Sequence, residues 1–278
     1  MSTTPALHAL IFSKDRACQL DSLLRSLVDH MHVRLSTVTI LCACSHERYR
    51  EAYHLLMAQK FMDGIHWRFE DDFATDTRSV LGEMPDEELV MLLVDDDIMY
   101  RPFKEQSIFE RLSKKHLFIT IRADIAHERY ELPVFLPVGG VREWRWNYRK
   151  GSPSPWSYPF SLDGNILKGR TLKRMIKRIN FKAPNTLEGA MHRGRHAWWV
   201  KRMPLALAPM RSVVYNNPLN RVQTEGETWH RDITAAELNE QYLGGFRLNN
   251  AALYEVVPSD VHFAVAPEYE PFEARSTK

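Results

Sequence analysis

The stretch Leu89-Val90-Met91-Leu92-Leu93-Val94, which runs directly into Asp95-Asp96-Asp97, decides the fold class. Six consecutive apolar residues are typical of a central strand in a parallel sheet, which is buried on both faces. The three carboxylates, called the acidic triplet below, follow at its carboxyl end, where open α/β sheets bind ligands. The stretch therefore predicts an α/β domain with a site at the triplet.

The residues before this strand alternate between short apolar runs and helix-period segments. Such alternation is typical of an α/β fold with a mostly parallel central sheet flanked by helices. A turn carrying Lys14, Asp15 and Arg16 joins the first strand to the first helix, with Ser13 or Asp15 as the helix cap. We expect strands at Leu7–Phe12, Val38–Cys42 and Ile65–Phe69, helices at Leu20–Met31 and Glu47–Phe61, and a helical or looped segment at Asp72–Leu81.

Length and composition indicate an ordinary folded protein. The chain has 278 residues, 44% hydrophobic and 26% charged, so it can bury one core and carry an appended lobe. No apolar run approaches the roughly 18 residues of a membrane span, and Met1–Pro5 lacks the layout of a signal peptide. We therefore expect a cytoplasmic protein. Three cysteines, Cys18, Cys42 and Cys44, indicate neither a disulfide framework nor a zinc site.

Charge is distributed unevenly along the chain. Residues Arg142–Arg202, called the basic block below, hold fifteen Lys or Arg against three acids, a balance of +12 in a chain whose net charge is +2. Such an asymmetry predicts an anionic ligand. Within the block, Trp144 and Trp146 would share one face of a strand, as core residues or as a sugar-stacking surface.

The second half of the chain offers further local signals. Strands are expected at Leu117–Ile121 and Val134–Val138, and short helices at Ile108–Leu112 and Arg170–Ile179. The run Gly151-Ser152-Pro153-Ser154-Pro155 indicates a loop near the site, and Pro184–Glu188 indicates a turn entering a helix. Thr234-Ala235-Ala236-Glu237 is a capping-box pattern for a helix ending near Gly244-Gly245.

Clustered carboxylates need a counter-charge, since burial penalises their ionised form. Asp95 and Asp97 would aim into one site if the chain stays extended there. Hard oxygen ligands of this kind suit Mg²⁺ or Mn²⁺ holding substrate phosphates. The alternative is a solvated acidic turn that only ends the strand.

Several motifs together resemble nucleotide-sugar glycosyltransferases of the GT-A fold, in particular bacterial enzymes of the family 2 type. The resemblance extends from about Leu7 to about Phe263. It implies a single domain over 1–278, with a Rossmann-like nucleotide-sugar-binding half at about 7–103 and an acceptor-side half with a C-terminal lobe at about 104–278. The matching segments are Phe12–Arg16 with the Gln19–Leu27 helix, Leu93–Asp97, Tyr158–Asn165, Pro184–Glu188 and Asn217–Gln223.

The resemblance implies roles for the residues that match these motifs. Ser13, Lys14 and Arg16 would contact the donor nucleotide, although a charged turn capping a helix explains them equally. Asp95 would bind the ribose, and Asp96 would serve the donor sugar. Mn²⁺ or Mg²⁺ would be held by Asp97 with Asp95, and a third ligand would be His262, with His230 as second choice; either histidine could instead be structural.

The same resemblance implies the reaction. A nucleotide-diphosphate sugar, most simply a UDP-sugar, would donate its sugar to a hydroxyl of a glycan, a lipid-linked glycan or a nucleic acid. Glu188 would take the acceptor proton, or it could be only a local charge partner of the basic block. Gly189 stands where the family usually has Asp, so inversion and retention both stay open, as do the identities of sugar and acceptor.

Two other functions compete with glycosyl transfer. A phosphohydrolase with an aspartate nucleophile needs a small hydroxyl residue after its acid pair, but Ile98 and Met99 follow this one. A non-catalytic nucleic-acid-binding protein could use the basic block. Within that block, Arg193–Arg202 interleaves cations with Trp198 and Trp199, and it would be a loop over the diphosphate or a solvated basic segment.

Overall fold

One mixed sheet forms the centre of the molecule. The computed structural model describes residues 5–59, 61, 64–136, 143–220 and 233–273. In these residues nine strands follow the order β3-β2-β1-β4-β9-β6-β10-β8-β7, with β8 and β9 running against the others. The strands are β1 (Leu7–Lys14), β2 (Leu35–Ala43), β3 (Ile65–Phe69), β4 (Leu89–Val94), β6 (His116–Thr120), β7 (Phe135–Leu136), β8 (Glu143–Asn147), β9 (Asn165–Lys168) and β10 (Leu205–Pro209). The predicted mostly parallel α/β sheet is confirmed.

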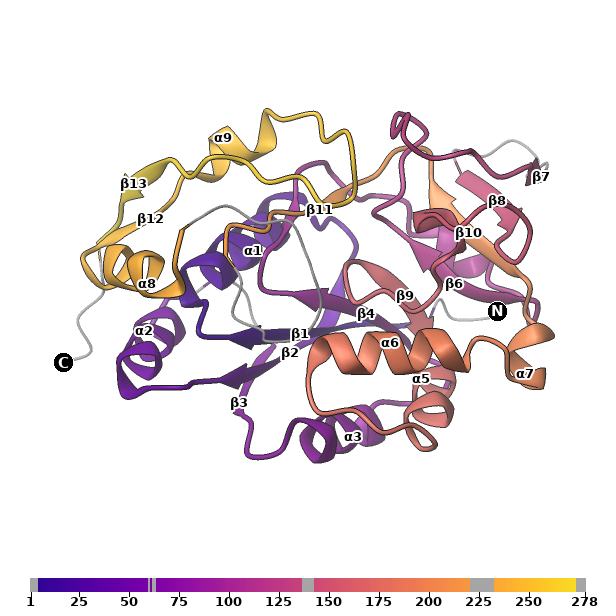
Figure 1. Ribbon diagram of the computed structural model, residues 1–278, viewed down its shortest axis with the longest axis horizontal. Helices are drawn as coiled ribbons and strands as arrows, with labels where there is room; N and C mark the ends of the chain where they lie inside the picture. Colours follow the sequence, from indigo (N-terminus) through magenta and orange to yellow (C-terminus); the bar gives the residue numbers. More distant parts are fainter. Residues whose placement is uncertain (1–4, 60, 62–63, 137–142, 221–232, 274–278) are drawn as a thin grey trace.

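Helices cover both faces of this sheet (Figure 1). α1, α2, α8 and α9 pack on one face, and α3, α5, α6 and α7 pack on the other. The helices are α1 (Ala17–His30), α2 (Glu47–Met57), α3 (Phe73–Glu83), α4 (Ser107–Glu110), α5 (Gly169–Ile176), α6 (Pro184–Gly194), α7 (Trp198–Lys201), α8 (Ala235–Leu243) and α9 (Asn250–Tyr254), with a 3-10 turn at Pro155–Ser157. Among the described residues, none of these helices is long and apolar enough to cross a membrane.

The predicted central strand is β4. Leu89, Met91 and Leu93 enter the core beneath α1, whereas Val90 and Leu92 enter the core on the opposite face, and all five are at most 1% exposed. Burying a side chain of this size contributes about 1.5–3 kcal/mol. The apolar run is therefore explained by burial on both faces.

Strand register brings the candidate site residues to one edge of the sheet. β1 pairs in parallel with β4, and Phe12 lies opposite Val94, so the turn after β1 and the acidic triplet lie together. β5 (Asp97–Met99) pairs with β11 (Val214–Asn216), which places Asn216 opposite Asp97. A smaller hairpin of β12 (Phe246–Leu248) and β13 (Tyr269–Pro271) lies beside α8.

Some local predictions hold, and others are wrong. The capping box of α8 is confirmed, because Glu237 donates its amide to the Thr234 hydroxyl while its carboxylate accepts from the Thr234 amide. The predicted caps of α1 are wrong: Arg16 is the cap position and has no side-chain cap bond. Ser13 instead hydrogen-bonds the Tyr53 hydroxyl, and Asp15 accepts from the Ser45 amide at 2.7 Å.

The tryptophan pair on β8 belongs to the protein interior. Trp146 is fully buried and packs edge-on against Phe118 and Trp156. Trp144 stacks on Phe135 and donates its indole N–H to a backbone carbonyl. This packing explains both rings without a bound sugar.

Candidate active site

A cavity of about 790 Å³ opens at the carboxyl ends of β1 and β4. Its wall combines segments that are far apart in the sequence: the turn after β1, the acidic triplet, the residues before β9, the start of α6 and the strand-like segments after β11. Predicted site residues in the wall are Ser13, Lys14, Arg16, Asp95, Asp96, Glu188 and His262, and Asp97 is absent from it. His230, the second-choice histidine, lies outside the described residues.

The turn after β1 is fixed by an unusual backbone conformation. Asp15 has φ of +57°, and its amide donates to the carbonyl of Ala43 at 3.1 Å. Asp and Asn adopt this left-handed conformation more readily than other non-glycine residues. The turn leaves the Lys14 side chain exposed at the cavity, while the Lys14 amide donates to Asp95 at 3.1 Å.

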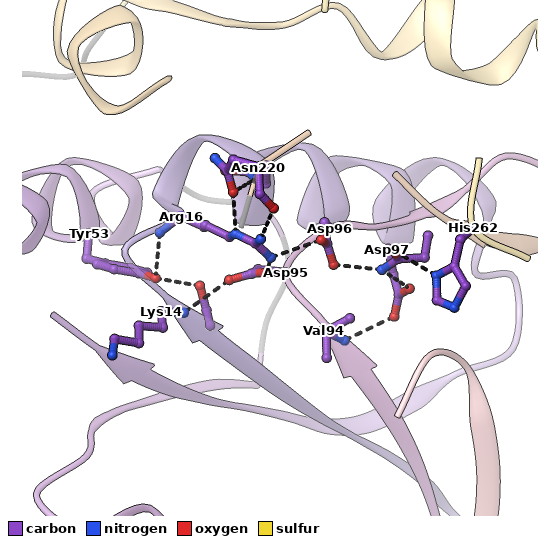
Figure 2. A network of polar contacts seen from close by, with 12 residues as sticks. Lys14, Arg16, Tyr53, Val94, Asp95, Asp96, Asp97, Asn220 and His262 are labelled. Atoms are coloured by element: carbon purple, nitrogen blue, oxygen red, sulfur yellow. Dashed lines mark hydrogen bonds and ion pairs between the residues drawn. The ribbon is translucent and has the colours of Figure 1, made fainter. Parts of the chain in front are cut away.

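Arg16 is the buried counter-ion of Asp95 and Asp96 (Figure 2). Its Nη1 donates to Asp95 at 3.0 Å and to Asp96 at 2.9 Å, and the three side chains are each at most 7% exposed. Its Nε donates to the Asn220 side-chain oxygen at 2.7 Å, and Nη2 donates to the Asn220 carbonyl. The guanidinium of Arg16 is therefore held by contacts to Asp95, Asp96 and Asn220.

Asp97 points away from Asp95, because the chain turns at residues 95–96 instead of staying extended. Its carboxylate is fully buried and accepts from the Val94 amide at 3.0 Å and from the Asn216 side chain at 3.3 Å. Burial, reinforced by the nearby Asp163 charge, raises the pKa of Asp97 well above its ordinary value. Burial also raises the pKa of Asp95, to about 6, against the opposing charge of Arg16.

The predicted metal ligands are not assembled into one group. Arg16 holds Asp95, whereas Asp97 and His262 meet at Asn216, whose side-chain oxygen is 3.2 Å from His262 Nδ1. Across the described part of the chain, no three His, Cys, Asp or Glu side chains are grouped so that they could hold a metal ion. The residues present therefore do not fit Mg²⁺ or Mn²⁺ as predicted, since a guanidinium already supplies the positive charge between two of the carboxylates.

Glu188 projects into the opposite wall of the cavity from the second turn of α6. Pro184 begins this helix, and the Thr186 hydroxyl accepts the amides of Lys182 and Ala183 at 2.9 Å each, which fixes the helix start. Glu188 is half-buried. Burial, reinforced by the nearby Asp163 charge, raises the pKa of Glu188 to about 7, while Arg122 opposes the shift.

Arg122 and Asp163 are site residues that the sequence reasoning missed as functional. Arg122 follows β6 and donates to Ser161 and Asp163, and its buried Nε has no hydrogen-bond partner among the residues that the structure describes. Asp163 precedes Gly164, which has φ of +83° and no room for a side chain beside Val214. Each of the two residues lies next to a strand end, at the sheet edge where the acidic triplet lies. This position relative to a strand is the sequence signal that could have identified them.

The described residues of the basic block form two strands of the sheet, β8 and β9, and the helices α5, α6 and α7. The expectation of a loop at Arg193–Arg202 is wrong. That segment ends α6 and forms α7, with Trp199 buried and Trp198 60% exposed. Arg174 and Arg202 lie over the Trp198 ring at 5.4 and 4.8 Å. The predicted loop before the 3-10 turn does border the cavity, through Ser154 and Pro155.

Comparisons with known proteins give similarities of fold. No family model matches the sequence, and no curated protein matches it. Among solved structures, TarS of S. aureus aligns with 10% identity and a TM-score of 0.45 over 76% of this chain and 36% of its own. The galactosyltransferase LgtC, solved with donor and acceptor sugar analogues, aligns with 12% identity and a TM-score of 0.40, over 90% of this chain and 97% of its own.

Mouse xyloside xylosyltransferase 1 in its apo form aligns with 11% identity and a TM-score of 0.39, over 70% of this chain and 84% of its own. At TM-scores below 0.5, each of these structures is similar to this chain only in outline.

Proposed function

We propose that this protein is a glycosyltransferase that moves a sugar from a nucleotide-diphosphate donor to a hydroxyl acceptor. One observation carries the proposal: in a single cavity, the residues that end β1 and β4 face a half-buried carboxylate, Glu188, whose pKa is raised to about 7. Such a transfer requires a sheet edge that binds the nucleotide and, in the same cavity, a general base whose pKa is close to neutral pH.

The donor half of the cavity is the edge formed by β1 and β4. Asp95 already accepts from Arg16 and the Lys14 amide, but each carboxylate oxygen has a second lone pair for a ribose hydroxyl. Lys14 and Arg122 place positive charge in the same wall, where a diphosphate would lie. These cations would stabilise the negative charge that develops on the departing diphosphate.

The acceptor half is the face of α6 that bears Glu188. The acceptor oxygen would attack the anomeric carbon of the donor as the bond from that carbon to the diphosphate oxygen breaks. Glu188 would take the proton of the acceptor hydroxyl, and the nucleoside diphosphate would leave with the electron pair of the broken bond. Arg122 and Asp163 would set the proton affinity of Glu188 through their opposite charges.

Metal dependence, expected from the triplet, is not part of this proposal. The reason is the geometry of Arg16, which occupies the position between Asp95 and Asp96. Asp97 and His262 both contact Asn216, and His262 Nε2 lies 3.9 Å from Asp163.

The test is release of nucleoside diphosphate from a panel of UDP-, GDP- and dTDP-sugars, in the presence of mixed glycan acceptors. We expect one donor class to be turned over, and Glu188→Gln to lower the rate by about 10²–10⁴-fold, the usual contribution of a general base. Glu83→Gln, which removes an exposed carboxylate on α3, is the matched control. No turnover with any donor, or a rate unchanged in Glu188→Gln, would contradict the proposal.

A further inference from the structure

A second cavity of about 610 Å³ adjoins the candidate active site along α6. It lies between the segment 180–182 and the face of α6 that carries Gly189 and Arg193. Four of its lining residues also line the larger cavity: Lys182, Asn185, Thr186 and Gly189. The two cavities therefore meet beside Glu188.

Gly189 borders both cavities. A Cβ built at this position would meet only the Arg193 Nη1 atom, at 3.5 Å. Glycine inside a helix costs about 1 kcal/mol relative to alanine, so its place in α6 is not explained by helix stability. A side chain here would lie beside Arg193, because residues four apart share one helix face.

The second cavity is positively charged. Its lining includes Lys182 and Arg193, and it contains no carboxylate among the described residues. The first turn of α6 contributes Asn185 and Thr186 to the same wall, and Arg193 comes from the last turn of the helix. Arg78 adds a further cation behind the cavity, with its guanidinium 4.7 Å from the ring of Phe181.

Arg193 is the arginine that lines this cavity. Neighbouring cations on α5 are paired, Arg170 with Glu87 at 2.6 Å and Lys173 with Asp86 at 2.8 Å. Arg193 is exposed, and its guanidinium has no hydrogen bond or ion pair within the part of the chain that the structure describes. A planar guanidinium of this kind is suited to bind a phosphate or carboxylate through two parallel hydrogen bonds.

We propose that the second cavity is an acceptor subsite that binds an anionic group, a phosphate or a carboxylate, through Arg193. This inference rests on the proposed function, because it assigns the acceptor to the α6 side. The hydroxyl that is glycosylated lies at Glu188, and the anionic group lies at Arg193, five residues and about 7–8 Å further along the helix axis. The substrate class is therefore a negatively charged acceptor.

Three small sugars test the proposal as probes: neutral glucose, glucose 6-phosphate and glucuronate. Dissociation constants are measured by NMR titration of the full chain. We expect at least one anionic sugar to bind tenfold or more tightly than glucose, and the two anionic probes separate a phosphate site from a carboxylate site. Equal binding of all three sugars, or no binding of either anionic sugar, would overturn the proposal.

Variants then locate the binding. Arg193→Gln should remove the preference for the anionic sugar, whereas Arg178→Gln, an equal charge change at an exposed residue outside the cavity, should leave it unchanged. A preference that survives Arg193→Gln would also overturn the assignment. Binding of a nucleoside diphosphate is measured in parallel: if the wild type binds no nucleotide yet keeps its Arg193-dependent preference, the glycosyltransferase proposal fails and the anion site stands.

Discussion

The carboxyl group of Glu188 lies where its ionised form is disfavoured, and this determines how the proposed reaction depends on pH. A general base acts only when it is ionised, so kcat/KM should be low below the Glu188 pKa of about 7 and reach a plateau above it. The substitution Asp163→Asn removes a negative charge that repels ionised Glu188 and leaves Arg122 without its ion-pair partner. Both changes lower the pKa of Glu188, so the acid limb of the pH–rate profile should move to lower pH. A pH–rate profile of both proteins checks this. An acid limb that stays in place in Asp163→Asn would show that a different group titrates.

Arg16 is expected to be the most sensitive single residue for stability near the site. Arg16→Met would leave the buried carboxylates of Asp95 and Asp96 without their cation, and removing one partner of a buried pair costs about 3–5 kcal/mol. Urea denaturation measures the free energy of unfolding. Arg34→Met, at an exposed arginine, should change it by less than about 0.5 kcal/mol. Equal effects of the two substitutions would refute the counter-ion role.

Residue patterns predicted the strand-end positions in the site but not their partners. Ser13, Lys14, Asp95 and Asp96 could be placed at one edge because each follows an apolar run, and the structure gathers all four in one cavity. The pairing of Arg16 could not be foreseen, since its partners lie 79, 80 and 204 residues further along the chain. Because Arg16 pairs with Asp95 and Asp96, the predicted metal ligands Asp95, Asp97 and His262 do not form one group.

At the scale of elements, the join between β9 and α5 depends on close contact at Gly169. A Cβ at this position would lie 2.5 Å from the carbonyl oxygen of Pro85, whereas a Cβ at Gly82 in α3 would meet nothing within 4 Å. Gly169→Ala should therefore destabilise the protein by about 1–3 kcal/mol, as overpacking does. Gly82→Ala should stabilise it by up to about 1 kcal/mol through helix propensity. Thermal unfolding of both variants should give shifts of opposite sign, and shifts of the same sign would contradict this contact.

Strands with long apolar runs were predictable, and the short strands of the second half were not. β3 and β4 match their predicted limits, because β4 is a continuous apolar run and β3 alternates apolar residues with His66 and Arg68. β9 has four residues and is held between β4 and β6, so its pairing depends on segments far away in sequence rather than on a local pattern. The same holds for β11, which forms only by pairing with β5.

At the scale of the whole molecule, two apolar cores lie on opposite faces of one sheet, and the cavity opens at the edge where β1 and β4 end (Figure 1). The basic block supplies the α6 wall of this cavity. The cavity thus combines an acidic edge, where Arg16 pairs with Asp95 and Asp96, with the cations Lys14, Arg122 and Lys182 in its lining. An anionic donor and an anionic acceptor group would each meet positive charge there.

The most direct test of this account is a thermal-shift titration with UDP, GDP, CDP and dTDP, each with Mn²⁺ and with EDTA, on the wild type, Asp95→Asn and the exposed control Asp71→Asn. A ligand that binds only the native state raises Tm, by about 2.7 kcal/mol of added stability at 100 times its Kd. We predict that one nucleotide raises Tm, with and without the metal, in the wild type and Asp71→Asn, and that the shift is lost in Asp95→Asn. If no nucleotide raises Tm while duplex DNA or RNA does, the protein is a nucleic-acid-binding protein and the central claim is wrong.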